Sequence, residues 1–202
     1  MESCCSPGVV LDRQRHALSV VLVINLAMFL IELGAGLRAR SSALLADSAD
    51  MLGDAVVYGF SLYIVGRGSI WQARSALLKG ALMGVFGAGI LAEAGTKLVR
   101  GVVPGAALMS GVGLLALAPN AVVLGLLWRH RADDLNMRSV WLCSRNDIVA
   151  NVGVLVAALG VRLTDRAWPD IVVGVAIAGL LVMSAAGVIR AALRPAAADR
   201  AA

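Results

Sequence analysis

Residues 42–66 read SALLADSADMLGDAVVYGFSLYIVG, an apolar run that is long enough to cross a bilayer and yet carries three aspartates. About 20 apolar residues are needed to cross a hydrocarbon core of about 30 Å as a helix. Backbone groups in lipid must find their hydrogen bonds within their own segment, and this run lacks the alternating pattern of a membrane β-barrel strand. The stretch therefore predicts a membrane-spanning helix with carboxyl groups inside it.

Five further apolar runs have a similar length, and the whole chain is 59% hydrophobic and only 15% charged. This composition is far from that of a soluble domain and typical of a polytopic membrane protein. The six predicted spans cover roughly 17–37, 42–66, 76–96, 106–128, 139–161 and 170–191. The connections between them are short. The sequence therefore predicts an all-α membrane protein with six transmembrane helices and no soluble domain.

The basic residues predict the orientation of the chain, because the side richer in Lys and Arg faces the cytoplasm. Eleven of them fall on the side that carries both termini and six on the other. We expect an integral protein of a bacterial-type inner (plasma) membrane, with a cytoplasmic tail over 1–16, a six-helix domain over 17–193 and a short cytoplasmic tail over 194–202. The basic residues are scattered among the connections, so no nucleic-acid partner is predicted.

Three aspartates inside the second predicted span and one inside the fifth need a functional explanation. An ionised carboxylate without a partner costs about 3 kcal/mol or more inside a bilayer. Asp50 and Asp54 are four residues apart in the second span, which places both carboxyls on one face of a helix. Cys143 and Asp147 repeat this spacing in the fifth span. Asp47, one turn before Asp50, either accepts a hydrogen bond that orients a metal ligand or belongs to an outer vestibule.

Two such pairs supply four ligands, the number that a tetrahedral Zn²⁺ site takes from oxygen and sulfur donors. We predict that Asp50, Asp54, Cys143 and Asp147 bind one divalent metal ion near the middle of the membrane. A plainer interpretation remains open, in which the aspartates line a water-filled vestibule and Cys143 is a small core residue.

The two pairs also lie in corresponding parts of the two halves of the chain. Residues 50–66, DMLGDAVVYGFSLYIVG, and 143–160, CSRNDIVANVGVLVAALG, each open with a pair and continue as an apolar run that ends in glycine. Each run is the middle span of a three-span half. Three spans per half invert the second half in the membrane, which is the plan of many secondary transporters with a site at mid-depth. The pattern predicts alternating access.

These residues carry a resemblance to a known family. Residues 30–55, LIELGAGLRARSSALLADSADMLGDA, resemble the first two helices of the cation diffusion facilitator (cation efflux) family. Residues 137–161, MRSVWLCSRNDIVANVGVLVAALGV, and 168–178, WPDIVVGVAIA, resemble its fifth and sixth. The similarity covers residues 17–193 and implies dimeric efflux of Zn²⁺ and related divalent ions, usually in exchange for protons.

The resemblance also implies a transport site, built from a His/Asp-x-x-x-Asp pair on helix two and a His-x-x-x-Asp pair on helix five. The matching positions are Asp50, Asp54, Cys143 and Asp147. Cys143 replaces the family's histidine, and this softer ligand favours Zn²⁺, Cd²⁺ or another thiophilic ion over Mg²⁺ or Mn²⁺. About ten residues follow the last span, so the resemblance is to a member that lacks the family's cytoplasmic C-terminal domain.

The expected function is efflux of a divalent metal cation, Zn²⁺-like with Cd²⁺ or Co²⁺ as further candidates, by a homodimer that is a proton antiporter. Three carboxylates and a thiolate carry more negative charge than one divalent ion neutralises, so we expect the empty site to retain shared protons that metal expels. The metal is cargo, so no cofactor is expected, and no metalloprotease-like motif predicts an enzyme. A passive divalent-cation channel and a non-transporting membrane metal sensor are the alternatives.

Several other polar and small residues in the spans have alternative predicted roles. Glu32 is predicted to make an interhelical hydrogen bond or to lie on a proton path. Asn151, on the face of Asp147, either orients that carboxylate or makes a helix-packing hydrogen bond. Arg145 either extends toward the cytoplasmic interface or bends back to the site. The spacings Gly80-x-x-x-Gly84 and Gly87-x-Gly89 in the third span allow close helix approach and would suit a dimer contact.

Overall fold

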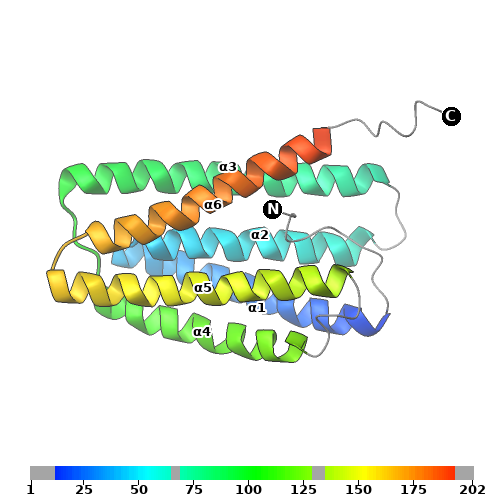
Figure 1. The fold of residues 1–202 in the computed structure, drawn as a ribbon, viewed down its shortest axis with the longest axis horizontal. Coiled ribbons are helices and arrows are strands. Elements are labelled where there is room, and N and C mark those ends of the chain that lie inside the picture. The colour runs from blue at the N-terminus through cyan, green and yellow to red at the C-terminus, as the bar shows by residue number, and fades with distance from the viewer. Residues whose placement is uncertain (1–11, 65–68, 129–134, 194–202) are drawn as a thin grey trace.

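All six predicted helices form in the computed structural model, which describes residues 12–64, 69–128 and 135–193. They run side by side along the long axis of the molecule (Figure 1). Their bounds are α1 Asp12–Ala39, α2 Ser42–Ile64, α3 Ser69–Arg100, α4 Ala106–Trp128, α5 Leu135–Thr164 and α6 Trp168–Leu193. Within the described ranges there is no strand, so the all-α fold class is confirmed. Helix α1 begins inside the segment 1–16 that was predicted to be a tail, whereas the segment 194–202 lies outside the described residues.

Three tight connections gather at one end of the bundle: α1 to α2, α3 to α4 and α5 to α6 (Figure 1, left). We call it the outer end, after the orientation predicted from the basic residues. Each contains one residue with a positive φ, namely Arg40 (53°), Gly101 (64°) and Asp165 (49°). Such a residue ends a helix by turning the chain out of the right-handed spiral. The amide of Gly101 accordingly donates to the carbonyl of Lys97, and that of Asp165 to the carbonyl of Val161. These turns bring the first turns of α2 and α6 to the same end as the last turn of α3.

Five of the helices are long and apolar enough to cross a membrane by length and composition, and α2 is the exception among the described helices. The reason is local. Every 18-residue stretch of Ser42–Ile64 includes Asp47, Asp50 and Asp54, whereas each of the other five helices has an apolar stretch of that length with at most two charged residues. Helix α2 nevertheless contacts α1, α3, α5 and α6. Its carboxyl groups are therefore surrounded by other helices and do not disqualify it as a span.

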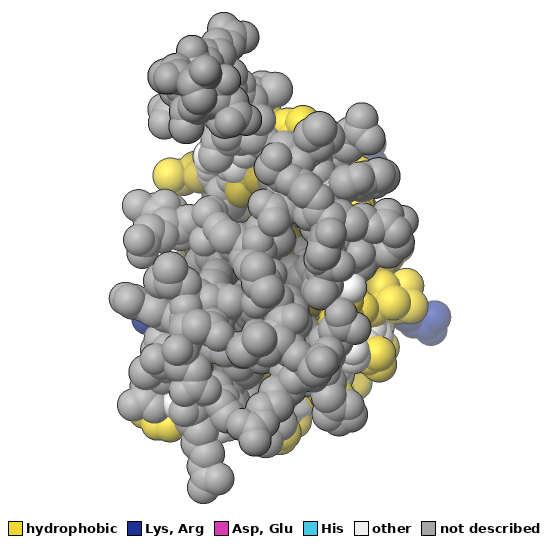
Figure 2. All heavy atoms as spheres, turned by 90° about the vertical axis from the view of Figure 1, so that its right-hand side faces the viewer, with side chains coloured by type: hydrophobic (Ala, Val, Ile, Leu, Met, Phe, Trp, Pro, Cys, Tyr) yellow, Lys and Arg dark blue, Asp and Glu magenta, His cyan; other side chains and the backbone are white. Residues whose placement is uncertain are grey.

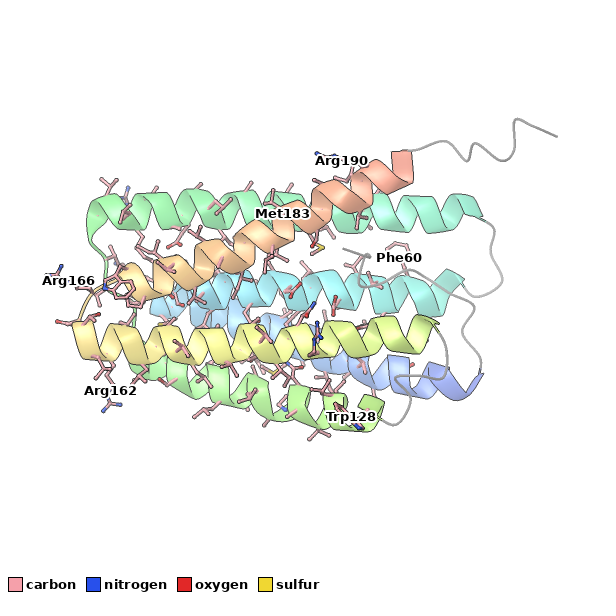
Figure 3. The ribbon with its side chains drawn as sticks, in the orientation of Figure 1. Phe60, Trp128, Arg162, Arg166, Met183 and Arg190 are labelled. Atoms are coloured by element: carbon pink, nitrogen blue, oxygen red, sulfur yellow. The ribbon has the colours of Figure 1, made fainter. Side chains whose placement is uncertain are left out.

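The outside of the bundle is apolar along its length, with charged side chains at its ends. Exposed residues include Val23, Val85 and Met183. Figure 3 shows Met183 midway along the bundle, with Arg162 and Arg166 at the outer end and Arg190 toward the other. Figure 2 looks onto that other end, and most of the described side chains at its rim are hydrophobic. This distribution suits a surface in contact with lipid.

Helices α3 and α6 pack closely because glycines remove side chains from their interface. A Cβ atom at Gly80 would lie 2.7 Å from Cγ1 of Ile189, and one at Gly87 would lie 2.7 Å from Cγ2 of Val182. Real Cβ atoms do not approach other atoms so closely. The interpretation of these two glycines as a dimer contact is therefore wrong, since α6 of the same chain occupies the space.

The core consists of separate apolar clusters with polar residues between them. An outer apolar cluster joins α1, α2, α4 and α5 near the outer end; its buried members are Ala35, Ala39, Ala43, Leu44, Met109, Val112, Val154, Ala157 and Ala158. A second cluster near the other end includes Val21, Tyr58 and Val123. Small side chains dominate the outer cluster, which lets the helices approach closely there. The predicted metal ligands of α2 lie between these two clusters.

Candidate functional site

The predicted acidic ligands lie in the interior of the bundle. Asp54 is 4% exposed and Asp147 is 3% exposed, whereas Asp50 is partly buried. They come from α2 and α5, which contact each other. With a rise of 1.5 Å per residue, Asp50 lies about 12 Å and Asp54 about 18 Å along α2 from Ser42. The structure therefore places three of the four predicted ligands inside the membrane domain on two neighbouring helices.

Cys143, the fourth predicted ligand, lies in α5 one helical turn before Asp147, as its spacing required. Its side chain lies outside the described part of the structure. Among the side chains that are described, no group of three His, Cys, Asp or Glu residues is arranged to hold a metal ion. The set of four ligands thus stays a prediction, and Cys143 is the member on which it depends.

Tyr58 extends the acidic face of α2 by one more turn. Its hydroxyl donates to Oδ2 of Asp54 over 3.3 Å, and its side chain is 1% exposed. Asp50, Asp54 and Tyr58 therefore form a stripe with a spacing of four residues along one side of the helix. Sequence reasoning missed Tyr58, although the same spacing that selected the two aspartates would have found it.

Two further residues of α5, Asn151 and Arg145, were predicted either to act on the proposed metal site or to have no part in it. The amide of Asn151 donates to the backbone carbonyl of Asp147 over 2.7 Å, a bond within its own helix, and its Oδ1 is buried without a hydrogen-bond partner. Asn151 is therefore no orienting group for the Asp147 carboxylate. Arg145 is exposed, in keeping with the interpretation that it extends away from the site.

A second pair of acids lies on the outer side of Asp50. Glu32 of α1 and Asp47 of α2 are both fully buried, and none of their four carboxylate oxygens has a hydrogen-bond partner. They are close enough for the charge of one to act on the other, and both are within electrostatic range of Asp50. Glu32 thus makes no interhelical hydrogen bond, which is one of the two roles predicted for it.

At the outer end, a network that we call the outer clasp ties α2 to α3 and α6. Its members are Ser41, Ser42, Glu93, Lys97 and Asp170. The carboxylate of Asp170 accepts hydrogen bonds from the Ser41 hydroxyl and from the backbone amides of Ser42 (2.8 Å) and Ala43 (3.2 Å). A carboxylate at a helix N-terminus interacts favourably with the helix dipole and satisfies free amides. Asp170 therefore caps α2 from a helix that is distant in sequence.

Lys97 completes the outer clasp from α3. Its Nζ lies 2.9 Å from Oδ2 of Asp170, 2.8 Å from the Ser42 hydroxyl and 3.4 Å from Oε1 of Glu93. The residue is only 3% exposed, although it lies one position beyond the predicted third span, 76–96. Gly174, one turn after Asp170, lets α6 come this close, because a Cβ atom there would lie 2.7 Å from the backbone of Ser42. Sequence reasoning missed the role of Asp170 and Lys97.

The outer clasp determines how far along the bundle the acidic face of α2 sits. It anchors the first turn of α2 to two other helices, and an α-helix is rigid along its axis over a few turns. Asp50 and Asp54 consequently keep a defined depth relative to α3 and α6.

Comparison with known proteins gives consistent matches. Residues 18–194 match the family described as the cation efflux transmembrane domain. The chain is 27% identical over 180 residues to the metal cation efflux system protein CzcD of Cupriavidus metallidurans and, to the same extent, to the cation efflux system protein CzcD of an Alcaligenes species. Each alignment covers 83% of this chain and 57% of the relative. The chain thus spans little more than half the length of these relatives.

Proposed function

This chain belongs to the cation efflux transmembrane domain family, and from that premise we propose that it exports divalent metal cations across a membrane. The observation that carries the proposal is the buried acidic face of α2 beside Asp147 of α5. Carboxylates are rarely retained inside a membrane domain unless they serve an ion or a proton. The family is one of transporters, which is consistent with the expectation that the protein is no enzyme.

The proposed metal ligands are Asp50, Asp54, Cys143 and Asp147. Their oxygen and sulfur donors suit Zn²⁺ or Cd²⁺, with Co²⁺ as a further candidate cargo. Tyr58, through its bond to Asp54, orients one of these carboxylates. The names of the CzcD relatives, which describe metal cation efflux, support the class of cargo and leave the choice of ion to experiment.

Proton antiport by alternating access is the mechanism that we propose. The predicted ligands carry a large negative charge when ionised, and metal ligands must lose their protons before they bind. Metal binding from one side therefore releases protons, and protons arriving from the other side help to release the metal. The protein is proposed to act as a homodimer in a bacterial-type inner membrane, with both termini in the cytoplasm.

A complementation assay combined with flux measurements tests this function. The full chain is expressed in a metal-sensitive strain that lacks its own efflux systems, and the purified protein is reconstituted in liposomes for Zn²⁺, Cd²⁺ and Co²⁺ flux. We expect tolerance and flux with the native chain and neither with Asp54→Ala. Asp165→Asn, which alters an exposed carboxyl between α5 and α6, is the matched control and should behave like the native chain. Equal flux with Asp54→Ala would refute the proposed site.

A further inference from the structure

Glu32 and Asp47 are two buried acidic residues that the proposed metal site does not include. Both side chains are 0% exposed, and all four of their oxygens lack a hydrogen-bond partner. A carboxylate in such a place is strongly disfavoured, because neither water nor a donor group replaces its hydration. Each also feels the negative charge of Asp50. Two ionised carboxylates cannot coexist there without a cation.

Among the side chains that the structure describes on the helices around the pair, every basic one is either exposed or held in the outer clasp. Helix α1 contacts α2 and α4, and α2 also contacts α3, α5 and α6. The basic residues on these helices with described side chains are Arg38, Lys97, Arg100, Arg145, Arg162 and Arg190. The described acidic residues, besides the pair, are Asp50, Asp54, Glu93, Asp147 and Asp170. Lys97 is bound to Asp170 and Glu93 in the outer clasp, and the five arginines are exposed.

The cation that fits the pair is a proton. A metal ion would need several donors, and the described side chains offer no group of three acidic, histidine or cysteine ligands. A proton needs a single carboxyl oxygen and leaves that group neutral. We propose that Glu32 and Asp47 form a proton-binding site, separate from the metal ligands, which holds the counter-ion of the transport cycle. The inference rests on the proposed antiport and assigns a place to its proton.

The position of the pair fits this role. Asp47 lies about 7.5 Å and Asp50 about 12 Å along α2 from Ser42, so the pair lies between the metal ligands and the outer end. The outer apolar cluster and the outer clasp cover it on that side. A proton that enters when the outer end opens meets Glu32 and Asp47 before it reaches the metal ligands.

The exchange step involves only proton transfer and ion binding. When a divalent ion binds beside Asp50, its charge lowers the affinity of the pair for the proton. The O–H bond of one carboxylic acid then breaks, the proton leaves to water, and the carboxylate that remains offsets part of the metal charge. Arrival of a proton from the outer side reverses these events and favours metal release.

Isothermal titration calorimetry tests the proposal by counting the protons that metal binding releases. Zn²⁺ is titrated into the purified full chain in buffers with different enthalpies of ionisation. We expect Glu32→Gln with Asp47→Asn to release about one proton fewer per metal ion than the native protein. The amides keep the size of the side chains, so Zn²⁺ affinity should change by less than about tenfold. Asp165→Asn, an exposed acid-to-amide change, is the control and should release as many protons as the native chain.

Infrared spectroscopy of the metal-free native protein detects protonated carboxyl groups directly. This measurement depends neither on transport nor on the correct folding of a variant. A protonated carboxylic acid gives a C=O band that shifts in D₂O, and Zn²⁺ should remove it. The band should be weaker in the double variant than in the native protein and unchanged in Asp165→Asn. An unchanged proton count in the double variant, or no such band in the native protein at neutral pH, overturns the proton site. Loss of metal flux in the native protein would instead refute the proposed function.

Discussion

Cys143 is the proposed ligand whose chemistry bears most directly on the choice of metal ion. A thiolate is a softer ligand than an imidazole and strengthens the binding of Cd²⁺ more than that of Co²⁺. We expect Cys143→His to lower Cd²⁺ flux relative to Zn²⁺ and Co²⁺ flux, as measured in liposomes with all three ions. Cys143→Ser, which removes the sulfur at nearly constant size, should weaken binding of all three. Unchanged ratios of flux in both variants would exclude Cys143 from the metal site.

Tyr58 is the second residue whose effect can be isolated. Its hydroxyl holds Oδ2 of Asp54, and loss of a group that orients a ligand typically lowers metal affinity by about tenfold or more. We expect Tyr58→Phe to weaken Zn²⁺ binding by about tenfold in a calorimetric titration, with an unchanged melting temperature. If Tyr58→Phe binds Zn²⁺ as tightly as the native protein, the hydroxyl serves packing alone.

At the scale of elements, the outer clasp links α2, α3 and α6 through one buried ion pair. Removal of one partner from such a pair leaves an uncompensated charge and costs about 3–5 kcal/mol. Lys97→Met and Asp170→Asn should each lower the apparent melting temperature in detergent strongly. The double variant should be destabilised by less than the two single effects together, because neither charge is then left alone.

Arg162→Met is the control for this cycle, since Arg162 is an exposed basic residue at the same end of the bundle (Figure 3). A surface change of this kind stays within about 0.5 kcal/mol. Strict additivity of the Lys97 and Asp170 effects would contradict the pairing.

Glycine positions on α6 give a second prediction for the elements. Gly174→Ala places a Cβ atom 2.7 Å from the backbone of Ser42, which must push α6 away from α2 and should cost about 2 kcal/mol. Gly179→Ala, five residues further along the same helix, meets no atom within 4 Å. It should stabilise the helix by up to about 1 kcal/mol, because alanine is the better helix former. Thermal unfolding of the two variants should therefore shift in opposite directions.

At the scale of the whole molecule, a transport measurement distinguishes antiport from passive flow. In liposomes that are acidic inside, with equal metal concentrations on both sides, an antiporter accumulates metal inside against its gradient. A channel only dissipates gradients. We expect Zn²⁺ accumulation that disappears when an ionophore collapses the pH gradient, measured with a trapped metal-sensitive dye. Zn²⁺ flux that ignores the pH gradient would support the passive channel.

Much of the fold was predictable because its determinants are local in sequence. Six apolar runs of membrane-spanning length became six helices, and the predicted bounds of α4, 106–128, agree with the structure. Other helices extend beyond the predicted spans, as α3 does from Ser69 to Arg100, since a helix can continue past the hydrocarbon layer. The spacing of Asp50 and Asp54 likewise required nothing beyond the helical repeat.

By itself, the sequence determined the six helices, the presence of three aspartates in α2 and the four-residue spacing of the predicted ligands. Each of these follows from length, hydropathy or helical periodicity, which are properties of a single segment. Only the tertiary structure decided what meets those segments. Asp170 caps α2 across 128 residues of chain, and Glu32 comes within electrostatic range of Asp47 from another helix. Such contacts depend on how the helices pack, and the pattern within any one helix does not contain that information.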